Sequence, residues 1–124
     1  SAGARVETIP GASAITAAVS LAGIAGNQFT FLGFAPNKKG RQTFFKKLND
    51  YDVQPVIFFE STHRIMKALA ALVDTAPIAT IYIARELTKI YEEMLIGTPA
   101  ELLTILETEP VRQKGEFVVL VDCR

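Results

Sequence analysis

Cysteine, histidine and tryptophan are almost absent from this sequence. Its 124 residues include one cysteine (Cys123), one histidine (His63) and no tryptophan. One cysteine excludes a disulfide within the chain, and a zinc site lacks enough Cys and His ligands. We therefore expect no metal site, and the cysteine usage fits the reducing cytoplasm.

Net charge is absent as well, because 13 Lys and Arg balance 13 Asp and Glu. Domains that bind nucleic acid unaided usually carry a basic excess, so this balance disfavours strong RNA binding by the chain alone. The hydrophobic fraction of 49% and charged fraction of 21% are typical of one globular domain with its own core.

Charged residues are missing altogether from Thr8 to Asn37. The stretch 9–26 is long enough to cross a membrane, but it contains Pro10, three glycines and several hydroxyl residues. We expect instead a helix over 11–22, buried against a sheet or a partner domain and without membrane contact. The small, featureless start predicts that residues 1–5 are a tag or linker remnant and that residues 6–124 form the domain.

Apolar periodicity predicts an alternation of strands and helices. Strands are expected at 29–34, 56–59, 79–84, 93–96 and 117–121. Further helices are expected at 40–50 with Arg41 in solvent, after a cap at Ser61 or Thr62, and from the capping box at Thr98–Glu101 to about Glu107. The pattern predicts an α/β layered sandwich, with a largely parallel or mixed, mostly five-stranded sheet flanked by about four helices.

Two of the predicted strands run directly into polar clusters. Glu60, His63 and Arg64 follow one strand, and Arg85, Glu86 and Lys89 follow another. Ligands of open α/β sheets bind beyond the carboxyl ends of the strands, so these six residues are site candidates. The alternative is that Glu60 and Glu86 pair with Arg64 and Arg85 only to hold the loops.

Three weaker signals each have two interpretations. His63 is either a general base or a surface residue at a helix start. The basic group of Lys38, Lys39, Arg41, Lys46 and Lys47 is either a phosphate-contact patch or a solvated helix face. Gly11, in the loop Ile9–Ala14, either lets the backbone approach a ligand or serves an ordinary turn.

The motifs, taken in order, resemble the C-terminal domain of the tetrapyrrole (corrin/porphyrin) methylase family. They are IPGASA, FTFLGF-P followed by KKGR, FFES-HR, ARELTK-YEE, GT-AEL and GEFVVLV, and they cover about Val6 to Val121. Within the family they are most similar to the members that methylate small-subunit ribosomal RNA. Thr62 is a departure, because proline is expected there.

The resemblance implies an S-adenosylmethionine-dependent methyltransferase with two α/β domains, a cofactor cleft between them and a homodimeric assembly. The N-terminal domain, which carries a glycine-rich cofactor loop, is not in this sequence. The implied reaction methylates a cytidine ribose 2′-hydroxyl in 16S ribosomal RNA. The alternatives are a corrin C-methyltransferase domain and a non-catalytic module on the same fold.

The resemblance also suggests roles for individual residues. We expect catalytic roles for Glu60, Arg85 and Glu86, and substrate contacts from His63, Arg64 and Lys89. The residues expected to line the cofactor cleft are Pro10, Gly11, Ser13, Ala14, Phe59, Leu87, Glu116 and Phe117.

Overall fold

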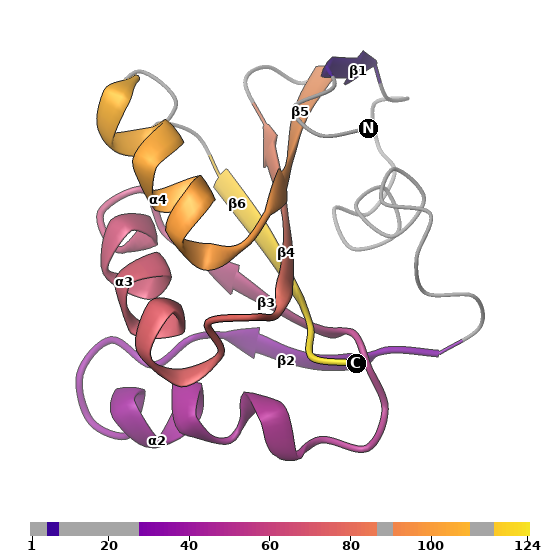
Figure 1. The fold of residues 1–124 in the computed structure, drawn as a ribbon, viewed down its shortest axis with the longest axis vertical. Coiled ribbons are helices and arrows are strands. Elements are labelled where there is room, and N and C mark those ends of the chain that lie inside the picture. The colour runs from indigo at the N-terminus through magenta and orange to yellow at the C-terminus, as the bar shows by residue number, and fades with distance from the viewer. Residues whose placement is uncertain (1–4, 8–27, 87–90, 110–115) are drawn as a thin grey trace.

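A six-stranded sheet forms the frame of the chain (Figure 1). The computed structural model describes residues 5–7, 28–86, 91–109 and 116–124, and only the main chain of 5–7, 85–86, 91–93 and 116. The strand order is β1-β5-β4-β6-β3-β2, and within these residues β2 and β3 form the parallel pair while the other pairs are antiparallel. The strands are β1 (Arg5–Glu7), β2 (Thr30–Phe34), β3 (Val56–Glu60), β4 (Thr80–Glu86), β5 (Tyr91–Gly97) and β6 (Glu116–Asp122).

The described helices all cover one face of this sheet, on the left in Figure 1. They are α2 (Arg41–Lys46), a short 3-10 helix (Leu48–Asp50), α3 (Ile65–Thr75) and α4 (Pro99–Thr108). Among the described residues, no helix is long and apolar enough to cross a membrane.

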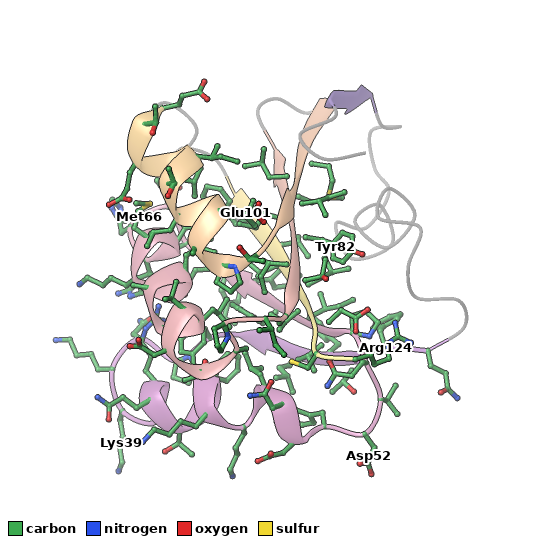
Figure 2. The ribbon with its side chains drawn as sticks, in the orientation of Figure 1. Lys39, Asp52, Met66, Tyr82, Glu101 and Arg124 are labelled. Atoms are coloured by element: carbon green, nitrogen blue, oxygen red, sulfur yellow. The ribbon has the colours of Figure 1, made fainter. Side chains whose placement is uncertain are left out.

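Two apolar clusters lie on opposite faces of the sheet. Successive strand residues point to opposite faces, so Phe58 joins the cluster beneath the helices while Ile57 joins the other. Figure 2 shows Tyr82, which packs against the second cluster, on the side of β4 away from the helices. Burying a side chain such as Phe58 or Ile57 completely stabilises the fold by about 1.5–3 kcal/mol. The near-continuous apolar sequence of β3 follows from burial on both faces.

The capping box at the start of α4 is present as expected. The Thr98 hydroxyl accepts from the Glu101 amide at 3.3 Å, and the Thr98 amide donates to the Glu101 carboxylate at 2.8 Å. This backbone hydrogen bond is the main reason why the pKa of Glu101 lies below its ordinary value. Stability from this pair is therefore present above the unfolded-state pKa of Glu101, and it is lost as pH falls through the folded-state value.

The mixed α/β sandwich is confirmed, with two differences in detail and one expected helix that is not tested. The sheet gains the short strand β1, whose first residue, Arg5, falls in the segment expected to be a remnant. The helix α3 begins at Ile65 with Arg64 at its N-cap and no side-chain cap, so the predicted cap at Ser61 or Thr62 is wrong. The helix expected over 11–22 lies outside the described residues.

Hydrogen bonds of the Gln54 side chain link Cys123, just after β6, to the turn after α2. Its side-chain amide donates to the carbonyl oxygens of Tyr51 at 2.9 Å and Leu48 at 3.3 Å, and its oxygen accepts from the Cys123 amide at 3.2 Å. Gln54 is buried, so both ends of the amide need these partners.

Replacing Gln54 by Glu should therefore destabilise the chain. The carboxylate keeps the acceptor but places an anion against the two carbonyl oxygens, which should cost about 2–4 kcal/mol in the free energy of unfolding. Urea unfolding measures this cost. Gln42→Glu is the matched control on exposed α2 and should change stability by less than about 0.5 kcal/mol. Equal midpoints for Gln54→Glu and the original chain would contradict this role.

Candidate functional site

The ends of three central strands, β3, β6 and β4, lie side by side along one end of the sheet. Both β3 and β4 run antiparallel to β6, so they share a direction and their carboxyl ends meet on either side of its first residues. Phe117 is the register partner of both Glu60 and Arg85, and Glu116 is the register partner of Glu86. We call these five residues the polar edge. Glu60, Arg85 and Glu86 of the two expected clusters therefore lie at the same strand ends, although the sheet is mostly antiparallel and consecutive strand residues such as Arg85 and Glu86 alternate between its faces.

Glu60 is buried at this edge in an ion pair. Its Oε2 accepts from Arg41 Nη2 at 2.8 Å, and its Oε1 accepts from the Ser61 amide at 3.0 Å. The Glu60 side chain is 2% exposed and that of Arg41 is 15% exposed. Both carboxylate oxygens are thus engaged on the helix-covered side of the sheet. This geometry favours the loop-holding alternative for Glu60 over a role as proton acceptor, with Arg41 as its partner in place of Arg64.

The Arg41 guanidinium joins four segments of the chain. Besides Glu60, it donates to the Pro36 carbonyl oxygen at 3.0 Å and lies 3.5 Å from that of Arg64. It also lies 5.0 Å from the centre of the Phe45 ring. A planar group with several fixed donors suits such a junction. The expectation of a solvated Arg41 was wrong, although its spacing of four residues from inward Phe45 placed both on one helix face.

The turn after β3 presents the only histidine to solvent. The Ser61 carbonyl oxygen accepts from the amides of Arg64 and Ile65, and the Ser61 hydroxyl accepts from Arg64 Nη1 at 3.2 Å. His63 is exposed on this turn, whereas Arg64 is half-buried. His63 is therefore accessible to a ligand beyond the strand ends, and Arg64 is partly committed to the turn.

Arg85 and Glu86 are the last two residues of β4 instead of following it. Arg85 lies in register between Phe117 and Glu93, and Glu86 lies in register between Glu116 and Glu92. Three acidic residues thus occupy consecutive cross-strand positions at the polar edge. These register positions place three acidic residues of the sequence at neighbouring strand ends.

Of the residues expected to line the cofactor cleft, Phe59 and Phe117 have side chains that the structure describes. The side chain of Phe59 is half-buried on the second face, and its ring lies against those of Phe31 and Phe34. The Phe117 side chain is 1% exposed in the core beneath the helices, so this side chain does not line a ligand site. Five of these candidates lie outside the described residues: Pro10, Gly11, Ser13, Ala14 and Leu87. The expected substrate contact Lys89 also lies outside them.

This chain is similar in sequence to two proteins of known name and similar in fold to a solved structure. Ribosomal RNA small subunit methyltransferase I of Xylella fastidiosa is 40% identical over 98% of this chain and 45% of its own length. The protein of the same name from Neisseria meningitidis is 40% identical over 96% of the chain and 41% of its own length. The chain therefore spans less than half the length of these two relatives.

A solved structure, the methyltransferase CobJ, superposes with a TM-score of 0.58 over 89% of this chain and 47% of its own, at 19% identity. That likeness concerns the fold alone. The family model for tetrapyrrole (corrin/porphyrin) methylases matches residues 1–103. The chain belongs to the tetrapyrrole (corrin/porphyrin) methylase family.

Proposed function

We propose that this chain is the C-terminal domain of an S-adenosylmethionine-dependent methyltransferase that methylates a cytidine ribose 2′-hydroxyl in 16S ribosomal RNA. The observation that carries this proposal is the 40% identity, over nearly the whole chain, to proteins named for methylating small-subunit ribosomal RNA. The polar edge supports it, because two polar strand ends lie together where ligands of α/β sheets bind.

The polar edge fits one wall of a site for S-adenosylmethionine. When bound, this cofactor supplies a methyl group on a positively charged sulfur. The acidic residues Glu86, Glu92 and Glu116, at neighbouring strand ends, carry the opposite charge, and the Phe59 ring offers an apolar surface on the neighbouring strand. The buried Phe117 fits only through its main chain. The other wall would come from an N-terminal domain with a glycine-rich loop.

The chain's own contribution to the reaction is the placement of the hydroxyl. Methyl transfer needs the ribose oxygen in line with the sulfur and methyl carbon, and such positioning is worth several powers of ten in rate. In this proposal Arg85 and Glu86 orient the substrate, and either Glu86 or His63 accepts the hydroxyl proton. His63, Arg64 and Lys89 contact neighbouring phosphates. Glu60 acts as a positioning residue that holds the turn carrying His63.

The proposed partners follow from the same relatives. They are the chain's own N-terminal domain, the small ribosomal subunit or its RNA, and a second copy in a homodimer. Ribosomal RNA is a cytoplasmic substrate, so the protein would act in the cytoplasm without a membrane.

Two other functions compete with this one. One is a corrin C-methyltransferase domain of the same family, which is less well supported because the 40% identical relatives are named for ribosomal RNA. A non-catalytic module would keep the fold without activity. Incubating the complete protein with labelled S-adenosylmethionine and small ribosomal subunits separates them, because label should appear on the 2′-oxygen of a cytidine. Label on a corrin precursor alone, or on nothing, would contradict the proposal.

Replacing Arg85 or Glu86 by Ala in the complete protein should lower single-turnover methylation by about 10²-fold or more, since each variant loses orientation or proton transfer. Melting temperature and cofactor affinity should stay near normal. Lys67→Ala and Glu107→Ala remove matching charges from exposed helix positions and should leave methylation unchanged. A large drop in melting temperature with normal turnover per folded molecule would make Arg85 and Glu86 scaffold residues.

A double-mutant cycle tests whether Glu60 is structural. Arg41→Met leaves the buried carboxylate unpaired and should cost about 3–5 kcal/mol in the free energy of unfolding. Combining it with Glu60→Gln should cost clearly less than the two single changes together. Lys47→Met, an exposed control at the end of α2, should cost less than about 0.5 kcal/mol. Glu60→Gln with intact stability and abolished turnover would instead identify Glu60 as the base.

A further inference from the structure

Two phenylalanines on β2, the last strand of the sheet, have exposed side chains. The Phe34 side chain, at the end of β2, is 71% exposed, and Phe31 on the same strand is 44% exposed. Both rings lie against Phe59, with ring centres 5.1 Å and 5.3 Å away. These three rings form what we call the aromatic step. Phe34 is thus held by packing on one side and open on the other.

A bulge in β2 creates this arrangement. From Phe31 to Phe34 is three residues, whereas their partners Ile57 and Phe59 are two residues apart. Without the extra residue, Phe31 and Phe34 would point to opposite faces of the sheet. Gly33 supplies the bulge with a φ of +74°, a conformation that favours glycine, although no atom lies within 4 Å of an added Cβ. Bulges often re-aim a side chain next to a functional site, and this one exposes Phe34.

Two lysines follow the aromatic step on a loop with a fixed main chain. The loop is tied to β3 by the Ala35 amide, which donates to the Phe59 carbonyl oxygen at 3.1 Å, and to α2 by the Arg41 contacts with Pro36 and Lys38. Lys38 and Lys39 are exposed, and no carboxylate in the described part of the chain forms an ion pair with them. Lys38 is four residues from Phe34, at most about 14 Å along the chain.

The charge of the chain is also unevenly distributed. Residues 38–67 contain seven Lys and Arg and three Asp and Glu, a net charge of +4 in a chain whose total is zero. Figure 2 shows Lys39 at the α2 end of the molecule, with Glu101 on α4 away from it. Within this segment, Lys38 and Lys39 come soon after the carboxyl end of β2, where Phe34 lies.

We propose that this surface binds single-stranded RNA, with a base stacked on Phe34 and adjoining phosphates contacting Lys38 and Lys39. Exposed aromatics flanked by basic residues bind unpaired nucleotides in this way, by stacking and by charge. Lysine is depleted at the centres of protein interfaces, so the pairing favours RNA over a second protein. Because β2 and β3 are parallel, the surface adjoins the polar edge, and the inference rests on the proposed RNA substrate.

The test measures binding of a fluorescein-labelled, cytidine-containing single-stranded oligonucleotide of small-subunit RNA to the complete protein, by anisotropy over a series of KCl concentrations. Phe34→Ala and Phe34→Leu should each weaken RNA binding about tenfold. Phe34→Tyr, which keeps a ring, should bind RNA as tightly as the original protein. The double change Lys38→Ala with Lys39→Ala should make the slope of log affinity against log salt shallower by about 1.4. The same double change at Lys46 and Lys47 removes equal charge and should leave the slope nearly unchanged.

Each remaining outcome counts against the proposal. Normal RNA affinity in all Phe34 and Lys38/Lys39 variants, in a protein that still methylates RNA, would overturn this surface and leave the proposed function standing. A changed molar mass by light scattering, with unchanged RNA affinity, would assign the aromatic step to a protein contact. A protein that neither binds nor methylates RNA would refute the proposed function itself.

Discussion

The buried ion pair between Arg41 and Glu60 is the contact on which this end of the domain depends. It joins the start of α2 to the end of β3, 19 residues apart in the sequence. A buried carboxylate without a partner is costly, so the pair fixes where α2 can lie against the sheet. Through Pro36 and Arg64 the same guanidinium also positions the loop before α2 and the turn before α3.

This arrangement places two different surfaces at neighbouring strand ends. The polar edge lies where β3, β6 and β4 meet, and the aromatic step lies one strand further, on β2 and β3. The ion pair includes Glu60 of the polar edge, and it also holds the loop with the lysines and the turn with His63. In the proposed enzyme, substrate RNA would approach across β2 toward the methyl donor at the polar edge.

Local signals predicted local structure well. The capping box at Thr98–Glu101 and the apolar strands were found from sequence because both depend on residues only a few positions apart. The α3 start was missed because a main-chain turn at Ser61, and no side-chain cap, begins that helix.

Features that depend on contacts between distant parts of the chain were harder to predict from the sequence. Strand direction depends on pairing across the whole chain, so a largely antiparallel sheet could not be told from a parallel one by periodicity. Glu60 and Arg85 were nevertheless expected near the carboxyl ends of their strands, and they lie close to each other because these buried strands share a direction. The prediction of a solvated Arg41 rested on its charge and not on its spacing of four residues from Phe45. The exposure of Phe34 depends on a bulge in β2, of which Gly33 is the only sign in the sequence.

Amide hydrogen exchange in the Arg41→Met variant tests most directly whether the ion pair organises this end of the domain. The account predicts faster exchange at the amides of Ala35, Ser61 and Ile65, which belong to the segments that Arg41 holds. Exchange at Leu102 and Glu109, in and after α4, should be unchanged, as it should be throughout Lys47→Met. Faster exchange spread evenly over the chain, or unchanged exchange at Ala35 and Ser61, would contradict the central place given to this pair.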